Sequence, residues 1–269
     1  MLNDSFCSRV AKGLKTAWLG RSIAFTPTVS STNDVAREAA LRGEREGFAA
    51  LAERQTMGRG RLGRPWYAPR GSILLSLLLR PKIPPAQIFS LTMLTGSAVG
   101  AGVERATGVV CDLKWPNDVL VGGKKLGGIL TEASLGSDGI EFAVVGLGLN
   151  VNLDFAGQPE LAKKATSLSL ELGKRVSRLP LLRRILEEIE WRYEVLQSGD
   201  YERIHGEWRS RLSTLGKEVT VTDGSWSETG LAHDVDLDGA LILRCQDNTL
   251  LRVITGDVSL REMKGGDEE

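Results

Sequence analysis

The sequence contains few of the side chains that usually carry covalent or metal chemistry. It has two histidines, His205 and His233, and three widely spaced cysteines without a C-x-x-C pair. A three-histidine zinc site and an H-E-x-x-H helix are therefore excluded, and neither a disulfide framework nor a zinc knuckle is supported. A Ser-His-Asp triad would have to use one of these two histidines. We therefore expect reduced cysteines and a reaction that does not run through histidine.

An excess of charge of either sign and a long apolar run are absent too. Lysine plus arginine number 34 and aspartate plus glutamate number 34, so the net charge is zero and indicates no particular partner. The apolar stretch Ile73–Leu79 is far shorter than the roughly 20 residues of a membrane span. The N-terminal segment is charged at Asp4, Arg9 and Lys12 and shows no signal-peptide pattern. We expect a cytoplasmic protein with neither a membrane nor a nucleic-acid partner.

The 269 residues, of which 42% are hydrophobic, suffice for about two domains with proper cores. Cap residues and apolar periodicity predict helices between Ser31 and Gly43 and over residues 86–106, 180–197 and 201–211. Short apolar runs between turn residues predict strands over residues 48–52, 73–79, 109–113, 118–121, 126–134 and 140–147. The intervening segment 58–71 is predicted to be a loop.

Several of these strands are joined by hairpin-sized turns such as Gly122-Gly123, which are too short for the crossovers that parallel neighbours need. Consecutive antiparallel strands with flanking helices predict an α+β fold rather than a doubly wound parallel sheet. After Leu215, strands alternate with Asp-Gly and Asp-Asn turns, which predicts a small β-barrel. We therefore expect a main domain over residues 1–212, a barrel over 213–263 and an acidic tail over 264–269. Residues 140–147 are a candidate edge strand that could pair in a homodimer.

The most unusual stretch is Gly58–Trp66, in which three arginines alternate with glycines ahead of an indole. Glycines let a backbone fold closely round a ligand, and arginines favour an anion. A tryptophan behind such a loop could stack on a purine or could simply belong to the core. A solvated basic loop and a nucleic-acid arm are the alternatives that local composition leaves open.

Three further stretches place polar groups or glycines at strand ends. The turn Lys114–Asp118 carries a cation, an amide and a carboxylate, although turn chemistry alone explains Pro-Asn-Asp. Lys125 leads into an apolar strand that lacks side-chain bulk at two glycines, which suits close packing or a ligand lying on the sheet. Gly146–Asn152 begins a G-x-G pattern, but Val151 replaces the third glycine, so a dinucleotide fingerprint fails.

Taken in order, these stretches resemble the biotin protein ligase family. The resemblance rests on Ser31-Thr32-Asn33, on Gln55 with the loop to Trp66, on Lys114–Asp118 with Lys125, and on Gly146–Asn152. It covers about residues 30–152, continues more loosely to residue 212, and includes the terminal barrel. It implies a mixed, mainly antiparallel sheet of the class II synthetase type and an SH3-like C-terminal barrel.

The resemblance implies an ATP-dependent reaction. Such enzymes join biotin to ATP, with Mg²⁺, to give biotinyl-5′-adenylate, and then transfer biotin to a lysine of a biotin carboxyl carrier protein or domain. An acyl adenylate is already activated, so no Ser or Cys nucleophile is needed. Some members repress transcription through an N-terminal helix-turn-helix domain, but the ligase-like pattern here begins near Ser30. We therefore expect the short form, without a repressor role.

The resemblance also implies a role for individual residues. The biotin-binding set is Ser31, Thr32, Asn33, Gln55, Arg59, Gly60, Arg61, Lys125, Gly127, Gly128, Gly146 and Gly148. The nucleotide-binding set is Arg59, Arg61, Arg64, Trp66, Lys114, Asn117 and Asn150. The implied catalytic groups are Lys125, Arg61, Lys114 and Asp118. Asp118 has three open roles: it could hold Mg²⁺, orient Lys114, or receive the proton of the acceptor lysine.

Two other functions remain as alternatives. A lipoate or octanoate ligase would share the general fold and the adenylate chemistry, but it would not need the loop that ends at Trp66. A biotin-binding sensor without turnover would keep Ser31 and Gln55, but it would have no reason to retain Lys125 and Asn117. The ordered combination of all four stretches favours the ligase.

Overall fold

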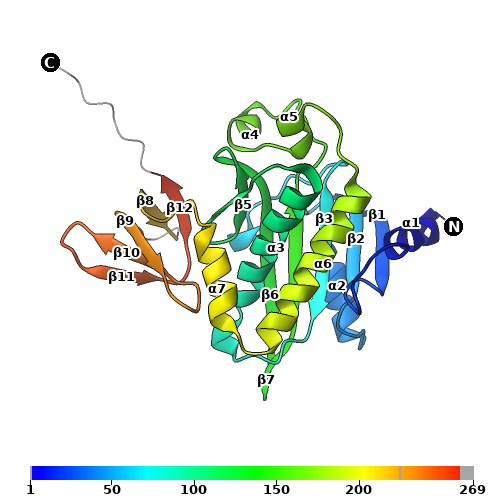
Figure 1. The fold of residues 1–269 in the computed structure, drawn as a ribbon, viewed down its shortest axis with the longest axis horizontal. Coiled ribbons are helices and arrows are strands. Elements are labelled where there is room, and N and C mark those ends of the chain that lie inside the picture. Colours follow the sequence, from blue (N-terminus) through cyan, green and yellow to red (C-terminus); the bar gives the residue numbers. More distant parts are fainter. Residues whose placement is uncertain (1, 224–225, 261–269) are drawn as a thin grey trace.

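The computed structural model describes residues 2–223 and 226–260. A seven-stranded sheet with helices on both faces forms the main body, and a five-stranded sheet stands beside it (Figure 1). The helices are α1 (Leu2–Ala11), α2 (Thr32–Leu41), α3 (Ser90–Thr107), α4 (Pro159–Lys164), α5 (Leu168–Leu172), α6 (Arg178–Gln197) and α7 (Tyr201–Ser210). The strands are β1 (Ile23–Val29), β2 (Ala49–Gln55), β3 (Ile73–Leu79), β4 (Asp112–Lys114), β5 (Asp118–Val121), β6 (Lys124–Gly136), β7 (Gly139–Leu149), β8 (Glu218–Thr222), β9 (Ser227–Val235), β10 (Leu241–Cys245), β11 (Leu250–Val253) and β12 (Asp257–Leu260).

The order of the large sheet is β1-β2-β3-β7-β6-β5-β4. Only the β1–β2 pair in this sheet, as far as residues 2–223 describe it, is parallel. The predicted α+β fold is therefore confirmed. The prediction that residues 140–147 form an edge strand is wrong, because β3 pairs with β7 over Ala143–Leu149 while β6 takes its other side.

β3 is buried at all seven positions because helices cover both faces of the sheet. Leu75 and Leu77 belong to the large core that includes residues of α3 and α6. Leu78 instead packs with Ala36 of α2 and Phe142 of β7 in a second cluster. This burial on both faces is why the strand reads as a continuous apolar run rather than an alternating one.

α3 is the central helix of the core. The segment Pro85–Thr107 has the length and apolar composition of a membrane span, with a mean hydropathy of 1.3, but 78% of that window is buried inside the protein. Gly102 allows α6 to approach closely, because a Cβ there would lie 2.9 Å from Ile185 Cγ1. The helices α3 and α6 are therefore closely packed at this glycine. Cys111, just beyond the helix, is 2% exposed, and burial raises the pKa of its thiol to about 12.

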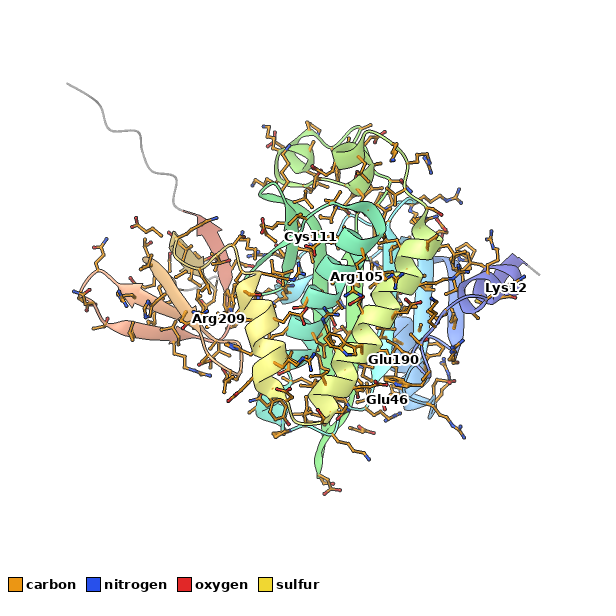
Figure 2. All side chains as sticks on the ribbon, viewed as in Figure 1. Lys12, Glu46, Arg105, Cys111, Glu190 and Arg209 are labelled. Atoms are coloured by element: carbon orange, nitrogen blue, oxygen red, sulfur yellow. The ribbon has the colours of Figure 1, made fainter. Side chains whose placement is uncertain are left out.

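The small sheet has the order β11-β10-β9-β8-β12 and packs against the α7 side of the main body (Figure 1). Arg209 of α7 reaches it and donates to Asp234 at 2.6 Å (Figure 2). Gly239 has a φ of +88° and fits against Phe89, and its carbonyl accepts from Trp115 Nε1 at 2.9 Å. The SH3-like geometry stays a prediction, and the tail 264–269 lies outside the described residues.

A buried carboxylate of α6 fixes the chain between α1 and β1. Glu190, labelled on α6 in Figure 2, is 8% exposed and accepts from the amides of Ala17, Trp18 and Leu19 at 2.7, 2.9 and 2.9 Å. These contacts satisfy backbone donors that would otherwise be buried without partners. The segment that leads into β1 is therefore anchored to the main helical layer.

Candidate functional site

A cavity of about 270 Å³ opens beside the middle of the large sheet. Its wall comes from the start of α2, the end of β2, the loop Gly58–Trp66 (hereafter the glycine–arginine loop), the β4–β5 turn, β6, β7 and β12. The predicted residues that line it are Ser31, Thr32, Asn33, Gln55, Arg59, Gly60, Arg61, Arg64, Trp66, Lys114, Asn117, Asp118, Lys125, Gly128, Gly146 and Gly148. Gly127 and Asn150 are not among the lining residues.

Two glycines of β7 form the floor. A Cβ on Gly146 would lie 2.2 Å from Asn33 Oδ1, and one on Gly148 would lie 2.5 Å from Trp66 Cε2. Gly128 pairs with Gly148 across the β6–β7 ladder and extends this bare strip. The missing side chains therefore let Asn33 and Trp66 lie directly on the sheet.

One end of the cavity is polar and uncharged. Ser31 caps α2, and its Oγ accepts a hydrogen bond from the backbone N–H of Asn33 at 3.3 Å. Gln55 Oε1 accepts from both the amide and the hydroxyl of Thr32, at 2.7 and 2.8 Å. Ser76 Oγ donates to Asn33 Oδ1 at 2.6 Å. All five side chains are fixed by hydrogen bonds, which gives this end a defined set of donors and acceptors.

The glycine–arginine loop folds back on itself as a tight turn. Gly60 donates to Arg64 O at 2.7 Å, and Trp66 donates to Gly58 O at 2.8 Å. At the tip, Leu62 takes a left-handed φ of 55° and is 63% exposed. The turn places the Trp66 ring on the floor, and the indole Nε1 is buried without a hydrogen-bond partner among residues 2–223 and 226–260.

The three arginines of this loop point to different partners. Arg59 Nη2 donates to Asp34 Oδ1 at 2.7 Å, and this hydrogen bond is the main cause that raises the pKa of Arg59. Arg61 donates to Thr255 Oγ1 at 3.1 Å, and burial lowers its pKa. Arg64 forms an ion pair with Asp257 of β12. The loop is therefore attached to the main body at one end and to the small sheet at the other.

Two lysines face the middle of the cavity. Lys125 Nζ lies 2.6 Å from Asp118 Oδ1 and 5.4 Å from the centroid of the Trp66 ring. Burial lowers the pKa of Lys114, and the neighbouring charge of Lys125 lowers it further, whereas Asp118 raises it. The charged form of Lys114 therefore carries a desolvation cost.

The two predicted asparagines differ in position. Asn117 lines the cavity, and its Nδ2 donates to Ile129 O at 2.6 Å, which holds the β4–β5 turn against β6. Asn150 is 3% exposed, and its Nδ2 donates to Thr166 O at 3.1 Å outside the cavity. Gly127 likewise faces away from the lining, with Gly148 O 2.9 Å from the position of a Cβ.

Several residues of the site were not predicted from the sequence. Glu132 accepts from Asn33 and Arg59, and it lies on the same face of β6 as Gly128 because the two are four residues apart. A carboxylate inside a mostly apolar strand was the available signal. Asp257 and Val258 line the cavity from β12, and no local pattern could have placed them there.

Within residues 2–223 and 226–260, no group of three or more His, Cys, Asp or Glu side chains could hold a metal ion. Asp118 and Asp257 both reach the cavity, and each already pairs with a cation, Lys125 or Arg64. Mg²⁺ that arrives with a nucleotide usually needs one or two protein carboxylates besides phosphate oxygens and water. Asp118 therefore fits as a single ligand of a nucleotide-bound Mg²⁺ rather than as part of a resident metal centre.

The large mixed sheet carries a cavity with glycines on its floor and cations on its wall, and a second sheet stands beside it. This combination of fold and cavity defines the class of protein to which the chain belongs. Residues 25–150 match the family model described as Biotin/lipoate A/B protein ligase family. Residues 214–261 match the model described as Biotin protein ligase C terminal domain. The first matched region covers most of the large sheet, and the second covers the small sheet.

Relatives narrow this class. The chain is 35% identical to Bifunctional ligase/repressor BirA of Bacillus spizizenii, over 94% of this chain and 78% of the relative. It is also 35% identical to Biotin--[acetyl-CoA-carboxylase] ligase of Mycobacterium tuberculosis, over 91% of each chain. The solved structure of the biotin protein ligase from Aquifex aeolicus in complex with biotin and ATP superposes with a TM-score of 0.77, at 29% identity, over 90% of this chain and 99% of that one. The chain belongs to the biotin protein ligase family, which confirms the resemblance drawn from the sequence.

Proposed function

We propose that this chain joins biotin to ATP and transfers the biotinyl group to a lysine of a biotin carboxyl carrier protein or domain. The observation that carries the proposal is the position of Lys125. Its Nζ lies 5.4 Å from the centroid of the Trp66 ring, and it lines the same cavity as the uncharged polar groups and as Lys114 and Arg64. A carboxylate and a phosphate can therefore meet at one ammonium group.

The polar end suits the ureido ring of biotin, which presents both N–H donors and a carbonyl acceptor. Thr32, Gln55 and Asn33 offer groups of both kinds. Specificity for biotin over an apolar acyl chain then follows, because an acyl chain offers no hydrogen bond to these polar groups.

In the first step, an oxygen of the biotin carboxylate attacks the α-phosphorus of ATP, and pyrophosphate leaves with the electron pair of the broken P–O bond. Lys125 offsets the negative charge of the two approaching anions, which would otherwise repel each other. Lys114, Arg61 and Arg64 lie where they can bind the phosphate oxygens, and the exposed part of the Trp66 ring provides a surface for adenine. Asp118 would contribute one ligand to the Mg²⁺ that accompanies ATP, which supplies further charge neutralisation.

In the second step, the neutral amine of an acceptor lysine attacks the acyl carbon, AMP leaves, and the amine proton is released. Asp118 lies at the cavity wall and fits the role of proton acceptor as well as that of metal ligand. The proposal divides the work between residues 1–212, which bind biotin, and residues 213–263, which close the nucleotide end through Asp257 and Val258. The name of the Mycobacterium tuberculosis relative points to acetyl-CoA carboxylase as the source of the carrier.

The test is pyrophosphate exchange into ATP by the purified protein with biotin, with lipoate, with octanoate and without any acid. We expect exchange only with biotin. Exchange with lipoate or octanoate alone would move the protein to the sister ligases that the family model also includes. No exchange with any acid, together with measurable biotin binding, would identify a biotin-binding protein without turnover.

A further inference from the structure

A continuous hydrogen-bond network joins the polar end of the cavity to the glycine–arginine loop. Ser76 Oγ contacts both Thr32 Oγ1, at 2.8 Å, and Asn33 Oδ1, at 2.6 Å. Asn33 Nδ2 in turn donates to Glu132 Oε2 at 2.6 Å. The same carboxylate accepts from Arg59 Nη2 at 3.3 Å. Glu132 therefore touches the polar end on one side and the loop on the other.

Arg59 is the loop side of this connection. Its Nη2 is held by Asp34 of α2, at 2.7 Å, and by Glu132 of β6, at 3.3 Å. Two carboxylates from different elements thus bind one guanidinium, and such charge-assisted contacts are stronger than neutral hydrogen bonds. The side chain of Arg59 is 30% exposed, and the polar contacts described for it are those with Asp34 and Glu132.

Asn33 is the ligand side of the connection. Its side chain lies directly over Gly146, where even a Cβ would be 2.2 Å from Oδ1, so it cannot move toward the sheet. Its oxygen is held by Ser76 and its nitrogen by Glu132. A shift of Glu132 therefore changes the orientation of a side chain at the polar end of the cavity.

We propose that Glu132 is a positioning residue that couples binding of biotin to closure of the glycine–arginine loop through Asn33 and Arg59. This inference rests on the proposed function for the identity of the ligand. Biotin in the polar end would contact Asn33, whose amide binds Glu132, and Glu132 in turn holds Arg59 and keeps the loop over the cavity. By linkage, closure of the loop strengthens biotin binding by the same factor.

The test variant is Glu132→Gln, which keeps the size of the side chain but removes the charge that faces Arg59. We expect the KM for biotin and the rate of adenylate release each to rise about tenfold, the effect of losing one partly exposed charge-assisted hydrogen bond. The adenylation kcat at saturating biotin should change much less, because Glu132 does not contact Lys125 or Trp66. The matched control is Glu141→Gln on β7, where the carboxylate accepts from Ser134 at 3.1 Å outside the cavity lining, and it should leave all three values unchanged.

Hydrogen exchange of the ligand-free protein tests the loop contact independently of turnover. The amides of Gly60 and Trp66, which donate within the loop, should exchange about tenfold faster in Glu132→Gln, while the amides of β3 stay protected as a folding control. Arg59→Met should accelerate exchange at least as much, because it removes the contacts with both Asp34 and Glu132, and the double variant should be no worse than Arg59→Met alone. Additive effects, or wild-type exchange and adenylate release in Glu132→Gln, would overturn the coupling. Absence of biotin-dependent turnover in the wild type would overturn the proposed function, and the ligand-free exchange data would still decide whether Glu132 holds the loop.

Discussion

At the scale of single residues, the two lysines of the cavity carry the same charge in different surroundings. Lys125 is compensated by Asp118 at 2.6 Å, and its side chain is 36% exposed. Lys114 has no hydrogen bond or ion pair among the interactions of the described residues, and burial lowers its pKa. The first lysine is therefore ready to exchange one anion for another, whereas the second gains a partner only when an anion enters.

We predict that Lys125→Ala slows biotin adenylation by roughly ten- to a hundredfold or more. The substitution removes a charge-assisted hydrogen bond worth about 1.5–3 kcal/mol in a site shielded from water. The measurement is biotin-dependent pyrophosphate exchange. Lys124→Ala is the matched control, because that neighbouring lysine is exposed and lies outside the cavity lining, and its rate should equal the wild type. Equal rates for both variants would remove Lys125 from the mechanism.

The lowered pKa of Lys114 predicts a pH effect on the use of ATP. The charged ammonium is the form that we propose binds phosphate, and its fraction falls as the pH rises through the pKa, so kcat/KM for ATP should fall over the same range. Because burial lowers the pKa of Lys114, this loss should begin below the pH at which an ordinary lysine titrates. The pH profile of kcat/KM measures it, and Lys114→Arg should move the alkaline loss to higher pH. An unchanged alkaline limb in that variant would assign the titration to another group.

Much of the cavity could be predicted from residues, but the direction of each side chain could not. Ser31 to Asn33, the glycine–arginine loop and Lys125 all line the cavity, because strand ends and tight turns gather functional groups. Asn150 was predicted as a site residue for the same reason as Asn117. Its side-chain amide instead donates to Thr166, and no sequence pattern links these two residues. Only the packing of the segment after β7 distinguishes the two asparagines.

At the scale of elements, α6 does more than cover the sheet. Its buried Glu190 binds three consecutive amides of the segment that precedes β1. The carboxylate can do so because both of its oxygens accept, and an amide side chain has only one acceptor oxygen. This single residue therefore orders a stretch that has no regular secondary structure of its own.

We predict that Glu190→Gln lowers the free energy of unfolding by about 1–3 kcal/mol, because at least one backbone N–H is left buried opposite an NH₂ group. Urea unfolding of the full chain measures the change. Glu194→Gln on the exposed side of the same helix is the control and should change stability by less than about 0.5 kcal/mol. A loss of equal size in the two variants would mean that Glu190 contributes no more than a surface residue.

The helices and strands that could be predicted from the sequence are those with a strong pattern of apolar residues and turns. β3, α6 and α7 lie where apolar spacing and turn residues placed them. α1, β1, α4 and α5 were missed for local reasons: β1 is a partly exposed edge strand that contains Pro27, and the short α4 has no buried residue. β12 was missed because it follows β11 closely and gains its identity by pairing with β8, far back in the sequence. Such long-range pairing leaves no signature in a local window.

At the scale of the whole molecule, the small sheet contributes Asp257 and Val258 to the cavity, at the end that we propose binds the nucleotide. Gly239 is the tightest point of the junction, since a Cβ there would lie 2.0 Å from Phe89 Cδ1. The polar end of the cavity, by contrast, is formed by hydrogen-bonded residues of α2 and of the large-sheet strands β2 and β3. Loosening the junction should therefore affect the two substrates differently.

We predict that Gly239→Ala raises the KM for ATP by about tenfold or more, while the Kd for biotin rises by a smaller factor, because Arg59 still holds the glycine–arginine loop to the main body. The expected loss follows from the clash with Phe89, which moves Asp257 and Val258 away from the cavity. Calorimetric titration with biotin and steady-state kinetics with ATP measure the two effects. Gly216→Ala isolates backbone strain, because Gly216 also has a positive φ, of 75°, but a Cβ there would meet nothing within 4 Å. If both variants weaken ATP use equally, strain rather than docking is responsible.

The attachment of the glycine–arginine loop to the small sheet also sets a time at which the enzyme can first work. Arg61 and its acceptor Gly256 are 195 residues apart, so translation makes the loop long before its anchor. Domains fold largely in the order of their synthesis, at about 5–20 residues per second. For several seconds or longer, a ribosome would therefore carry the polar end of the cavity, which we propose binds biotin, while the strand that bears Asp257 and Val258 is still being made. A nascent chain in that state could hold biotin without activating it, so the reactive adenylate would form only after β12 has left the ribosome and docked.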